Sequence, residues 1–149
     1  MATSSSCYGL PNGKSKTVIV TGGANGIGAQ TVRIYHTRGC NIVIADLPSS
    51  SEAADALISS LAEPSRATYY PTNIVSWSDM QGLFRETKKM FGQVDVVVAN
   101  AGLMESKDFF DFEEDEQGEL IEAIEAGKII DVNLKGTMNS ELLVLTHFL

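Results

Sequence analysis

The chain has 149 residues, enough for one domain with a substantial core and too few for two comfortable domains. Hydrophobic residues make up 44% and charged residues 20%, which is typical of a soluble globular protein, and no apolar run is long enough to cross a membrane. The net charge of −8 argues against a nucleic-acid partner, because binding a phosphate backbone requires a basic face.

Residues 1–15 are polar and rich in serine, and we expect a loose leader before a single domain over residues 16–149. The leader lacks the apolar core that a secretory signal carries. Two cysteines and two histidines give neither a disulfide framework nor the spacing of a metal site. We therefore expect a cytoplasmic protein that binds no metal.

Short apolar runs predict four buried strands, because the strands of a parallel sheet are covered on both faces. The runs cover residues 17–20, 40–46, 67–71 and 94–99. Helical spacing and stop signals predict helices over residues 26–38, 51–62 and 76–91, ended by Gly39, Pro64 and Gly92. A last helix begins near Leu120 or Ile129 and continues to the C-terminus.

The apolar residues of the three helices recur at helical spacing, as in helices that cover a sheet. They are Ile27, Thr31, Ile34 and Tyr35 on the first helix, Ala54, Leu57 and Leu61 on the second, and Met80, Leu83, Phe84 and Phe91 on the third. Strands that alternate with helices predict an α/β fold with a doubly wound parallel sheet. Right-handed crossovers give a Rossmann-type half sheet with strand order 3-2-1-4.

A glycine-rich stretch, residues 21–28, follows the first strand and leads into the first helix. Gly22, Gly26 and Gly28 let the backbone approach a ligand and let the helix approach the sheet. Such a helix start directs N–H groups and the positive end of its dipole at a ligand, which suits a pyrophosphate. A plain strand–turn–helix connection is the alternative.

Asp46 ends the second strand, where a carboxylate can accept hydrogen bonds from an adenosine ribose and repel a 2′-phosphate. Residues 47–50, which begin with Leu47, contain no Arg or Lys to hold a phosphate. These residues favour NAD over NADP. Alternatively, Asp46 simply ends a strand in a turn.

Two further motifs follow in order: Asn100-Ala101-Gly102 after the fourth strand and Asp131-Val132-Asn133-Leu134 on the last helix. With the glycine stretch and Asp46, they resemble the short-chain dehydrogenase/reductase family from residue 16 onward. The acid at the second strand is similar to the NAD-dependent, 15-hydroxyprostaglandin-dehydrogenase-like branch. The resemblance implies a nicotinamide-dependent oxidoreductase that acts on an alcohol or ketone.

The resemblance implies a role for each matching position. Gly22, Gly26 and Gly28, with the backbone near Asn25 and Ile27, would hold the pyrophosphate. Asp46, with Leu47 beside it, would take the adenosine ribose, while Asn100, Ala101 and Gly102 would line the nicotinamide ribose and brace the central strand.

One position departs from the family's pattern, and one on the last helix matches it. The family usually carries an Asp at the end of the third strand that touches adenine, and this chain offers Asn73 followed by Ile74. We therefore expect a weakened adenine contact. Asn133 would distort its helix and free a backbone carbonyl for a water in a proton relay. Otherwise Asn133 is a mid-helix amide bonded to the neighbouring backbone.

The chain departs from the family in its catalytic groups. The resemblance implies a Ser and a Tyr-x-x-x-Lys pair, in which the Lys lowers the Tyr pKa so that the phenol can exchange a proton. The chain's tyrosines are followed four positions later by other residues: Tyr8 by Asn12, Tyr35 by Gly39, Tyr69 by Asn73 and Tyr70 by Ile74. We expect a chain truncated before its catalytic part and inactive alone, taking a small-molecule substrate only if a catalytic half is supplied.

Two other functions remain open: a non-catalytic dinucleotide-binding or partner module, and an enzyme that uses this fold for other chemistry. The acidic run 113–116, continuing to Glu125, predicts a solvated loop or helix start or, alternatively, a metal site. The apolar residues near the C-terminus form packed core or an exposed patch. Because the fourth strand has one edge without a predicted neighbour, we expect association into a homo-oligomer.

Overall fold

The computed structural model describes residues 16–106 and 114–148, so the expected leader lies outside the described residues. Within them, four parallel strands form one sheet in the order β3-β2-β1-β4, as predicted. The strands are β1 (Thr17–Thr21), β2 (Asn41–Asp46), β3 (Ala67–Pro71) and β4 (Val96–Val98). Pro71, which cannot donate to a ladder, is the last residue of the edge strand β3.

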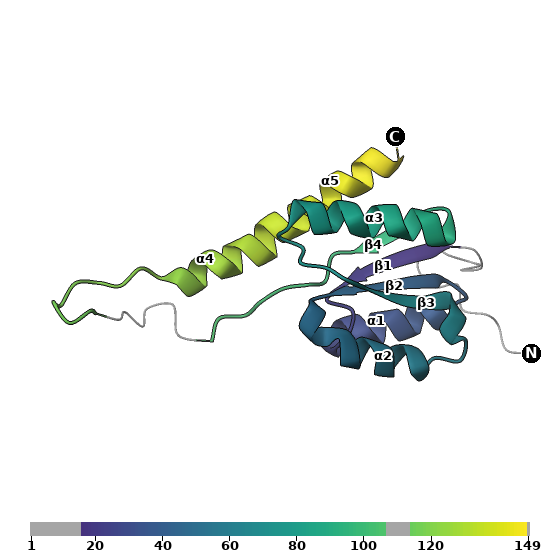
Figure 1. Ribbon diagram of the computed structural model, residues 1–149, viewed down its shortest axis with the longest axis horizontal. Helices are drawn as coiled ribbons and strands as arrows, with labels where there is room; N and C mark the ends of the chain where they lie inside the picture. Colours follow the sequence, from purple (N-terminus) through teal and green to yellow (C-terminus); the bar gives the residue numbers. More distant parts are fainter. Residues whose placement is uncertain (1–15, 107–113, 149) are drawn as a thin grey trace, which may run out of the picture.

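Helices cover both faces of this sheet (Figure 1). The helices α1 (Gly26–Thr37) and α2 (Ser51–Ser59) pack on one face, and α3 (Trp77–Phe91) and α5 (Thr137–Phe148) pack on the other. Short 3₁₀ turns, η1 (Pro48–Ser50) and η2 (Pro64–Arg66), precede α2 and β3. The arrangement is the α/β, Rossmann-type architecture predicted from the alternation of elements.

The strands alternate between two cores. Val18 and Val20 contact the cluster under α1 and α2, whereas Ile19 contacts the cluster under α3 and α5. Every residue of β1 is buried, which explains why its sequence is a continuous β-branched run instead of an alternating one. Strand β2 also contributes to both clusters, so the two central strands join the layers.

The cap geometry confirms the predicted ends of α1 and α3, whereas α2 ends at Ser59, earlier than the predicted stop at Pro64. Gly39 (φ +90°) donates its N–H to the His36 carbonyl at 2.9 Å after α1. Ser76 caps α3, its Oγ accepting from the Asp79 N–H at 3.3 Å, and Gly92 (φ +83°) ends the same helix. Each of these caps depends on residues within one helical turn, so the sequence alone indicates it.

The inward face of α1 differs from the apolar stripe in the sequence. Gly28, Val32 and His36 are the buried residues, while Ile27 is 80% exposed and Ile34 is 48% exposed. The helix is turned so that Gly28, which has no side chain, lies against the glycine turn. Val32 and His36 follow at four-residue intervals on the same face.

The last helix is continuous but changes its winding. Helices α4 (Ile124–Ile130) and α5 lie on either side of η3 (Asp131–Gly136), a π-helical stretch. The α4 end of the helix projects from the body of the molecule (Figure 1). Asn139 of α5 donates to the Ile74 carbonyl at 2.8 Å, and any Cβ at Gly136 would collide with the Ile74 side chain. This contact docks α5 on the loop after β3.

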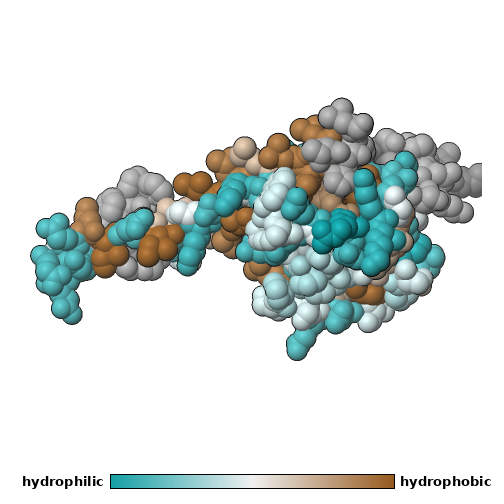
Figure 2. All heavy atoms as spheres, turned by 45° about the horizontal axis from the view of Figure 1, so that its top comes forward, coloured by the Kyte–Doolittle hydropathy of each residue, from teal (hydrophilic) through white to brown (hydrophobic). Residues whose placement is uncertain are grey.

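Several apolar side chains of this last helix are exposed, and Figure 2 shows apolar surface along the projecting part. They are Ile124, Ile130, Leu134, Met138, Leu142 and Leu145. Leu143 is buried between α5 and the sheet, so the apolar end of the chain is partly core and partly surface. No described helix has the length and apolar character needed to cross a membrane.

Candidate functional site

The sequence-predicted site residues come from loops at one edge of the sheet. In the parallel register Val20 lies between Ile44 of β2 and Val98 of β4, so the carboxyl ends of these three strands are level. The glycine turn, Asp46 and Asn100 each follow or end one of those strands. The fold thereby brings together residues far apart in the sequence, at the edge where such sheets bind ligands.

The glycine turn is packed too tightly for side chains at two of its positions. Gly22 has φ +62°, and a Cβ there would lie 2.9 Å from the Ala101 Cα. At Gly28 a Cβ would fall on the Gly22 carbonyl oxygen and lie 2.7 Å from Asn100 Nδ2. These two glycines therefore let the turn, the start of α1 and the segment after β4 pack against one another.

The first turn of α1 is left open. Asn25 precedes the helix with an extended backbone (φ −135°, ψ 169°), and its side chain makes no capping hydrogen bond within the described structure. The first turn also contains no acidic residue. Its N–H groups and the positive end of the helix dipole therefore face outward beside the exposed Ile27 side chain, an arrangement that suits an anion.

Asp46 links β2 to the glycine turn. Its Oδ2 accepts a hydrogen bond from the Ala24 N–H at 3.0 Å. Its Oδ1 accepts from the Leu47 N–H at 2.8 Å and from the Ser50 hydroxyl at 3.0 Å. The carboxylate lies at the predicted place with its orientation fixed by these three donors.

Asn100 connects the segment after β4 to the glycine turn. Its Nδ2 donates to the Thr21 and Gly22 carbonyls at 3.0 and 3.1 Å. Thr21, which the sequence reasoning did not single out, completes the link. Its buried hydroxyl accepts from the N–H groups of Asn100 (3.0 Å) and Ala101 (3.1 Å) and donates to the Val98 carbonyl at 3.3 Å. A Thr at the end of a strand carries no local signal of such a partner.

Asn133 lies within the π-helical stretch η3, so the helix distortion expected at this position is present. Its side chain does not bond to neighbouring backbone, which contradicts the alternative interpretation. Instead, Oδ1 accepts from the Leu103 N–H and Nδ2 donates to the Leu103 carbonyl, both at 2.8 Å. The Asn133 carbonyl accepts from the Thr137 hydroxyl at 2.9 Å. Asn133 thus fixes the path of the chain after Gly102.

The two candidates after β3 lie differently. Asn73 is exposed and its Oδ1 accepts from the Val75 N–H at 3.1 Å, while its own N–H donates to Asp79 at 3.1 Å. The Ile74 side chain is 7% exposed and belongs to the core against Gly136. Any contact of Ile74 with a ligand would therefore involve its backbone.

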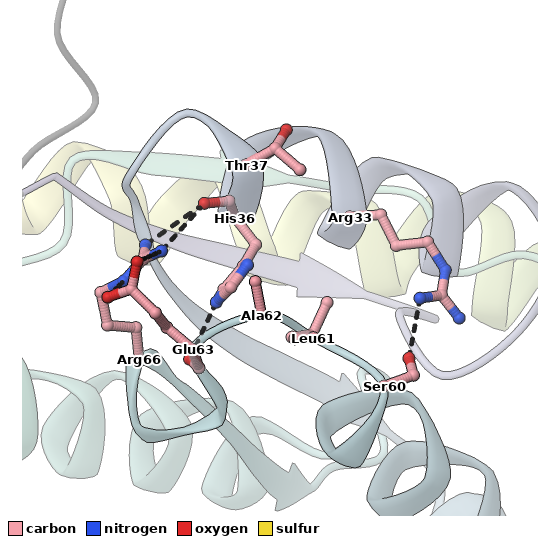
Figure 3. A pocket seen from close by; sticks show the side chains of 8 residues that line it. All are labelled: Arg33, His36, Thr37, Ser60, Leu61, Ala62, Glu63 and Arg66. Carbon is pink, nitrogen blue, oxygen red and sulfur yellow. Dashed lines mark hydrogen bonds and ion pairs between the residues drawn. The ribbon is translucent and has the colours of Figure 1, made fainter.

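A separate hollow of about 440 Å³ lies near the amino ends of β2 and β3, at the opposite edge of the sheet (Figure 3). Its wall consists of Arg33, His36, Thr37, Ser60, Leu61, Ala62, Glu63 and Arg66. Arg66 donates to the His36 and Cys40 carbonyls and pairs with Glu63, so it ties the end of α1 to the start of β3. These polar groups brace the fold away from the candidate site.

No cluster of potential metal ligands occurs among residues 16–106 and 114–148. The expected solvated acidic segment is exposed from residue 114 to residue 124, and Glu113 lies outside the described residues. Glu125 Oε1 accepts from the Ser106 N–H at 2.7 Å. The structure thus gives this acidic run a contact within the chain.

Comparison with known proteins gives a consistent result. The short chain dehydrogenase family model matches residues 16–149. The chain is 34% identical over 140 residues to "Short-chain dehydrogenase/reductase prx4" of Penicillium roqueforti, covering 93% of this chain and 38% of that protein. It is 31% identical over 128 residues to "Tropinone reductase-like 1" of Erythroxylum coca, covering 83% of this chain and 42% of that protein.

Solved structures share the fold. A short-chain dehydrogenase/reductase described as a glucose/ribitol dehydrogenase from Brucella melitensis superposes with a TM-score of 0.77 at 25% identity, covering 90% of this chain and 52% of that one. A 3-ketoacyl-(acyl-carrier-protein) reductase from the same organism, complexed with NADH, gives a TM-score of 0.72 at 23% identity, covering 91% and 50%.

The chain spans about two fifths of the length of the curated relatives that it matches, as the 38% and 42% coverages state. The matched part nevertheless includes the glycine turn, Asp46, the Asn100 segment and Asn133. A family model over residues 16–149, a relative that is 34% identical and a common fold agree. The chain therefore belongs to the short-chain dehydrogenase/reductase family of NAD(P)-dependent oxidoreductases.

Proposed function

We propose that this chain is the dinucleotide-binding part of a short-chain dehydrogenase/reductase that uses NAD in preference to NADP on an alcohol or ketone. The single observation that carries the cofactor preference is the Asp46 carboxylate, held at the end of β2 beside the glycine turn. No Arg or Lys occurs in residues 47–50 to attract a 2′-phosphate instead.

The residues present fit a dinucleotide. Gly22, Gly26 and Gly28 let the pyrophosphate approach the uncapped start of α1, next to Asn25 and Ile27. Three donors occupy three of the roughly four acceptor sites of the Asp46 carboxylate, which leaves about one for a ribose hydroxyl beside Leu47. The nicotinamide ribose is assigned to Asn100, Ala101 and Gly102, and adenine to Asn73 and the Ile74 backbone. The bound nicotinamide would donate or accept a hydride.

Electrostatics supports the preference for NAD. A 2′-phosphate carries a charge of about −1.5 to −2 at neutral pH. At 4 Å from a carboxylate, each pair of unit charges repels by about 4 kcal/mol at the effective dielectric constant of a protein surface. Three donors hold the Asp46 carboxylate, which limits its ability to turn away.

Asn133 is assigned a positioning role and, through its backbone carbonyl, a place beside a water in a proton relay. The two hydrogen bonds to Leu103 hold the segment that leaves the nicotinamide side of the site. The Thr137 hydroxyl donates to the Asn133 carbonyl, the atom that the proposed relay would use, at 2.9 Å.

We propose that the 149-residue polypeptide binds the cofactor but does not turn over by itself. None of its tyrosines is followed four residues later by Lys, so the phenol whose pKa the family lowers for proton transfer is missing from these residues. A small-molecule substrate would bind once a catalytic half is supplied. We also assign the chain to the cytoplasm, where the buried thiol of Cys40 would stay reduced.

The test combines binding with turnover on the purified polypeptide. NADH at one hundred times its dissociation constant should raise the free energy of unfolding by about 2.7 kcal/mol, while a panel of ketones should cause no NADH oxidation. Turnover of any ketone would refute the proposed lack of activity. Failure of NADH to change either the melting temperature or the amide NMR spectrum would refute the proposed cofactor site.

A second candidate function is that of a partner module, which would bind a full-length relative or a second copy of this chain. The observation in its favour is the exposed apolar surface of the last helix, which includes Leu134, Met138 and Leu142. Exposed apolar residues at four-residue intervals are typical of a helix that packs on another protein surface. Co-purification with a full-length relative, without NADH binding, would favour this function over the first.

A further inference from the structure

The segment between β2 and α2 carries Asp46, and two hydroxyl groups from different elements hold it in place. The Ser50 hydroxyl donates to Asp46 Oδ1 at 3.0 Å. The Tyr69 hydroxyl reaches across from β3 and donates to the Leu47 carbonyl at 2.8 Å, with the Asp46 carbonyl at 3.4 Å. One hydroxyl therefore holds the carboxylate, and the other holds the backbone next to it.

Ser50 lies at a position where a serine side chain ordinarily caps a helix. It is the N-cap residue of α2, yet its side chain makes no capping hydrogen bond. A Ser at this position usually accepts from an N–H of the first turn, which stabilises a helix by about 1 kcal/mol. Here the hydroxyl is turned back toward Asp46 instead. The Ser50 hydroxyl therefore donates to the Asp46 carboxylate and does not cap α2.

Tyr69 is placed to hold the Leu47 carbonyl permanently. It lies opposite Ile44 in the register of β2 and β3, and its half-buried ring packs against the core under α1 and α2. Burial raises the pKa of its phenol, and the charges of Asp46 and Asp55 raise the pKa further. The hydroxyl consequently remains protonated near neutral pH and keeps donating.

We propose that Ser50 and Tyr69 are positioning residues that set the preference for NAD over NADP by preventing Asp46 from turning away from the cofactor. This inference rests on the proposed function. A 2′-phosphate is tolerated beside an acid only if the acid rotates or its segment moves outward. Leu47 is 49% exposed, so the two hydroxyl bonds restrain a segment that otherwise faces solvent.

The experiment measures dissociation constants for NADH and NADPH by calorimetric titration of the full 149-residue chain. The variants are Ser50→Ala, Tyr69→Phe and the double variant, with Asp46→Asn to define the ratio without the charge. Ser50→Thr keeps a hydroxyl and should restore the wild-type ratio. Ser49→Ala and Tyr70→Phe are matched controls on the neighbouring exposed position and on the opposite face of β3.

A hydrogen bond to a charged group changes an equilibrium by at least about tenfold. We expect the ratio of the NADPH to the NADH dissociation constant to fall by about tenfold in Ser50→Ala, and by less in Tyr69→Phe, whose bond is to a carbonyl. The controls should keep the wild-type ratio. Because loss of structure weakens both nucleotides alike, the ratio separates positioning from stability.

Two kinds of result would overturn the inference, and they are distinguishable: an unchanged ratio and a lack of binding. If wild type prefers NADH and both variants keep its ratio, Ser50 and Tyr69 do not position Asp46, while the proposed function stands. The same conclusion follows if both nucleotides weaken equally. If wild type binds neither nucleotide, the proposed function fails as well.

Discussion

Asp95 joins the start of β1 to the segment before β4. Its carboxylate accepts from Lys16 Nζ at 2.7 Å, from the Thr17 N–H at 2.8 Å and from Gln93 Nε2 at 2.8 Å. Burial alone would raise the pKa of Asp95. The hydrogen bonds from Lys16, Thr17 and Gln93 outweigh burial, so the pKa of Asp95 is below its ordinary value.

This lowered pKa predicts a pH-dependent contribution to stability. A carboxyl whose pKa is lower in the folded state stabilises the fold above its unfolded pKa, and the contribution is lost as the pH falls through the folded pKa. We expect Asp95→Asn to reduce the free energy of unfolding by about 1–3 kcal/mol at pH 7, and the difference from wild type to shrink below about pH 4. Urea denaturation at several pH values measures this, with the exposed Asp55→Asn as control. A difference that is independent of pH would contradict the assignment.

Two threonines of β1 differ in their hydrogen bonds, so substitution by valine should change the free energy of unfolding in opposite directions. The Thr17 hydroxyl is buried and has no hydrogen-bond partner in the described structure, whereas the Thr21 hydroxyl makes three bonds. Because Val has the same shape, Thr17→Val should raise the free energy of unfolding by about 1 kcal/mol. Thr21→Val should lower it by about 1–3 kcal/mol. Chemical denaturation of both variants decides; equal shifts would contradict the hydrogen-bond assignments.

At the scale of elements, the glycine turn depends on close packing that can be tested by adding one methyl group. Gly28→Ala should lower the free energy of unfolding by about 1–3 kcal/mol, because the methyl group meets the Gly22 carbonyl oxygen. It should also weaken NADH binding. Gly127→Ala in α4 is the matched control, because a Cβ there meets nothing within 4 Å and Ala favours a helix. Thermal unfolding with and without NADH measures both; an unaffected Gly28→Ala would contradict the packing.

The elements themselves could be predicted from the sequence because their signals are local. The buried runs, the Ser76 cap and the glycines at 39 and 92 each act within a few residues. The face of α1 could not be predicted, because the contact of Gly28 with the glycine turn decides it, and apolar spacing does not report that contact.

The candidate site divides in the same way. The sequence indicated where Asp46, Asn100 and Asn133 lie. It did not indicate that Asn133 bonds to Leu103, that Thr21 holds Asn100, or that Ser50 holds Asp46. Two of these bonds join residues far apart in the chain, and all three depend on the orientation of a polar side chain, which no pattern of hydrophobicity specifies.

For the whole molecule, association is expected from the sequence because β4 is an edge strand, and the exposed apolar surface of the last helix offers a second face for it. Ile130, Leu134, Met138 and Leu142 recur every four residues and are between 49% and 60% exposed. We expect self-association of the 149-residue polypeptide at micromolar concentration, and Leu142→Glu should shift it toward monomer because the charge would be buried between copies. Sedimentation velocity measures this, with the neighbouring exposed Glu141→Gln as control. A wild-type chain that is monomeric would contradict the prediction.

The two ends of α1 are held by different numbers of hydrogen bonds, and the rates of amide hydrogen exchange should differ accordingly. At one end Arg66 donates to the His36 carbonyl of the last turn, while at the other end no side chain caps the first turn in the described structure. Amide protons of residues 26–28 should therefore exchange with solvent faster than those of the rest of the helix. If a pyrophosphate accepts those N–H groups, bound nucleotide would slow their exchange selectively, giving a site-resolved record of occupancy that needs no chemical turnover.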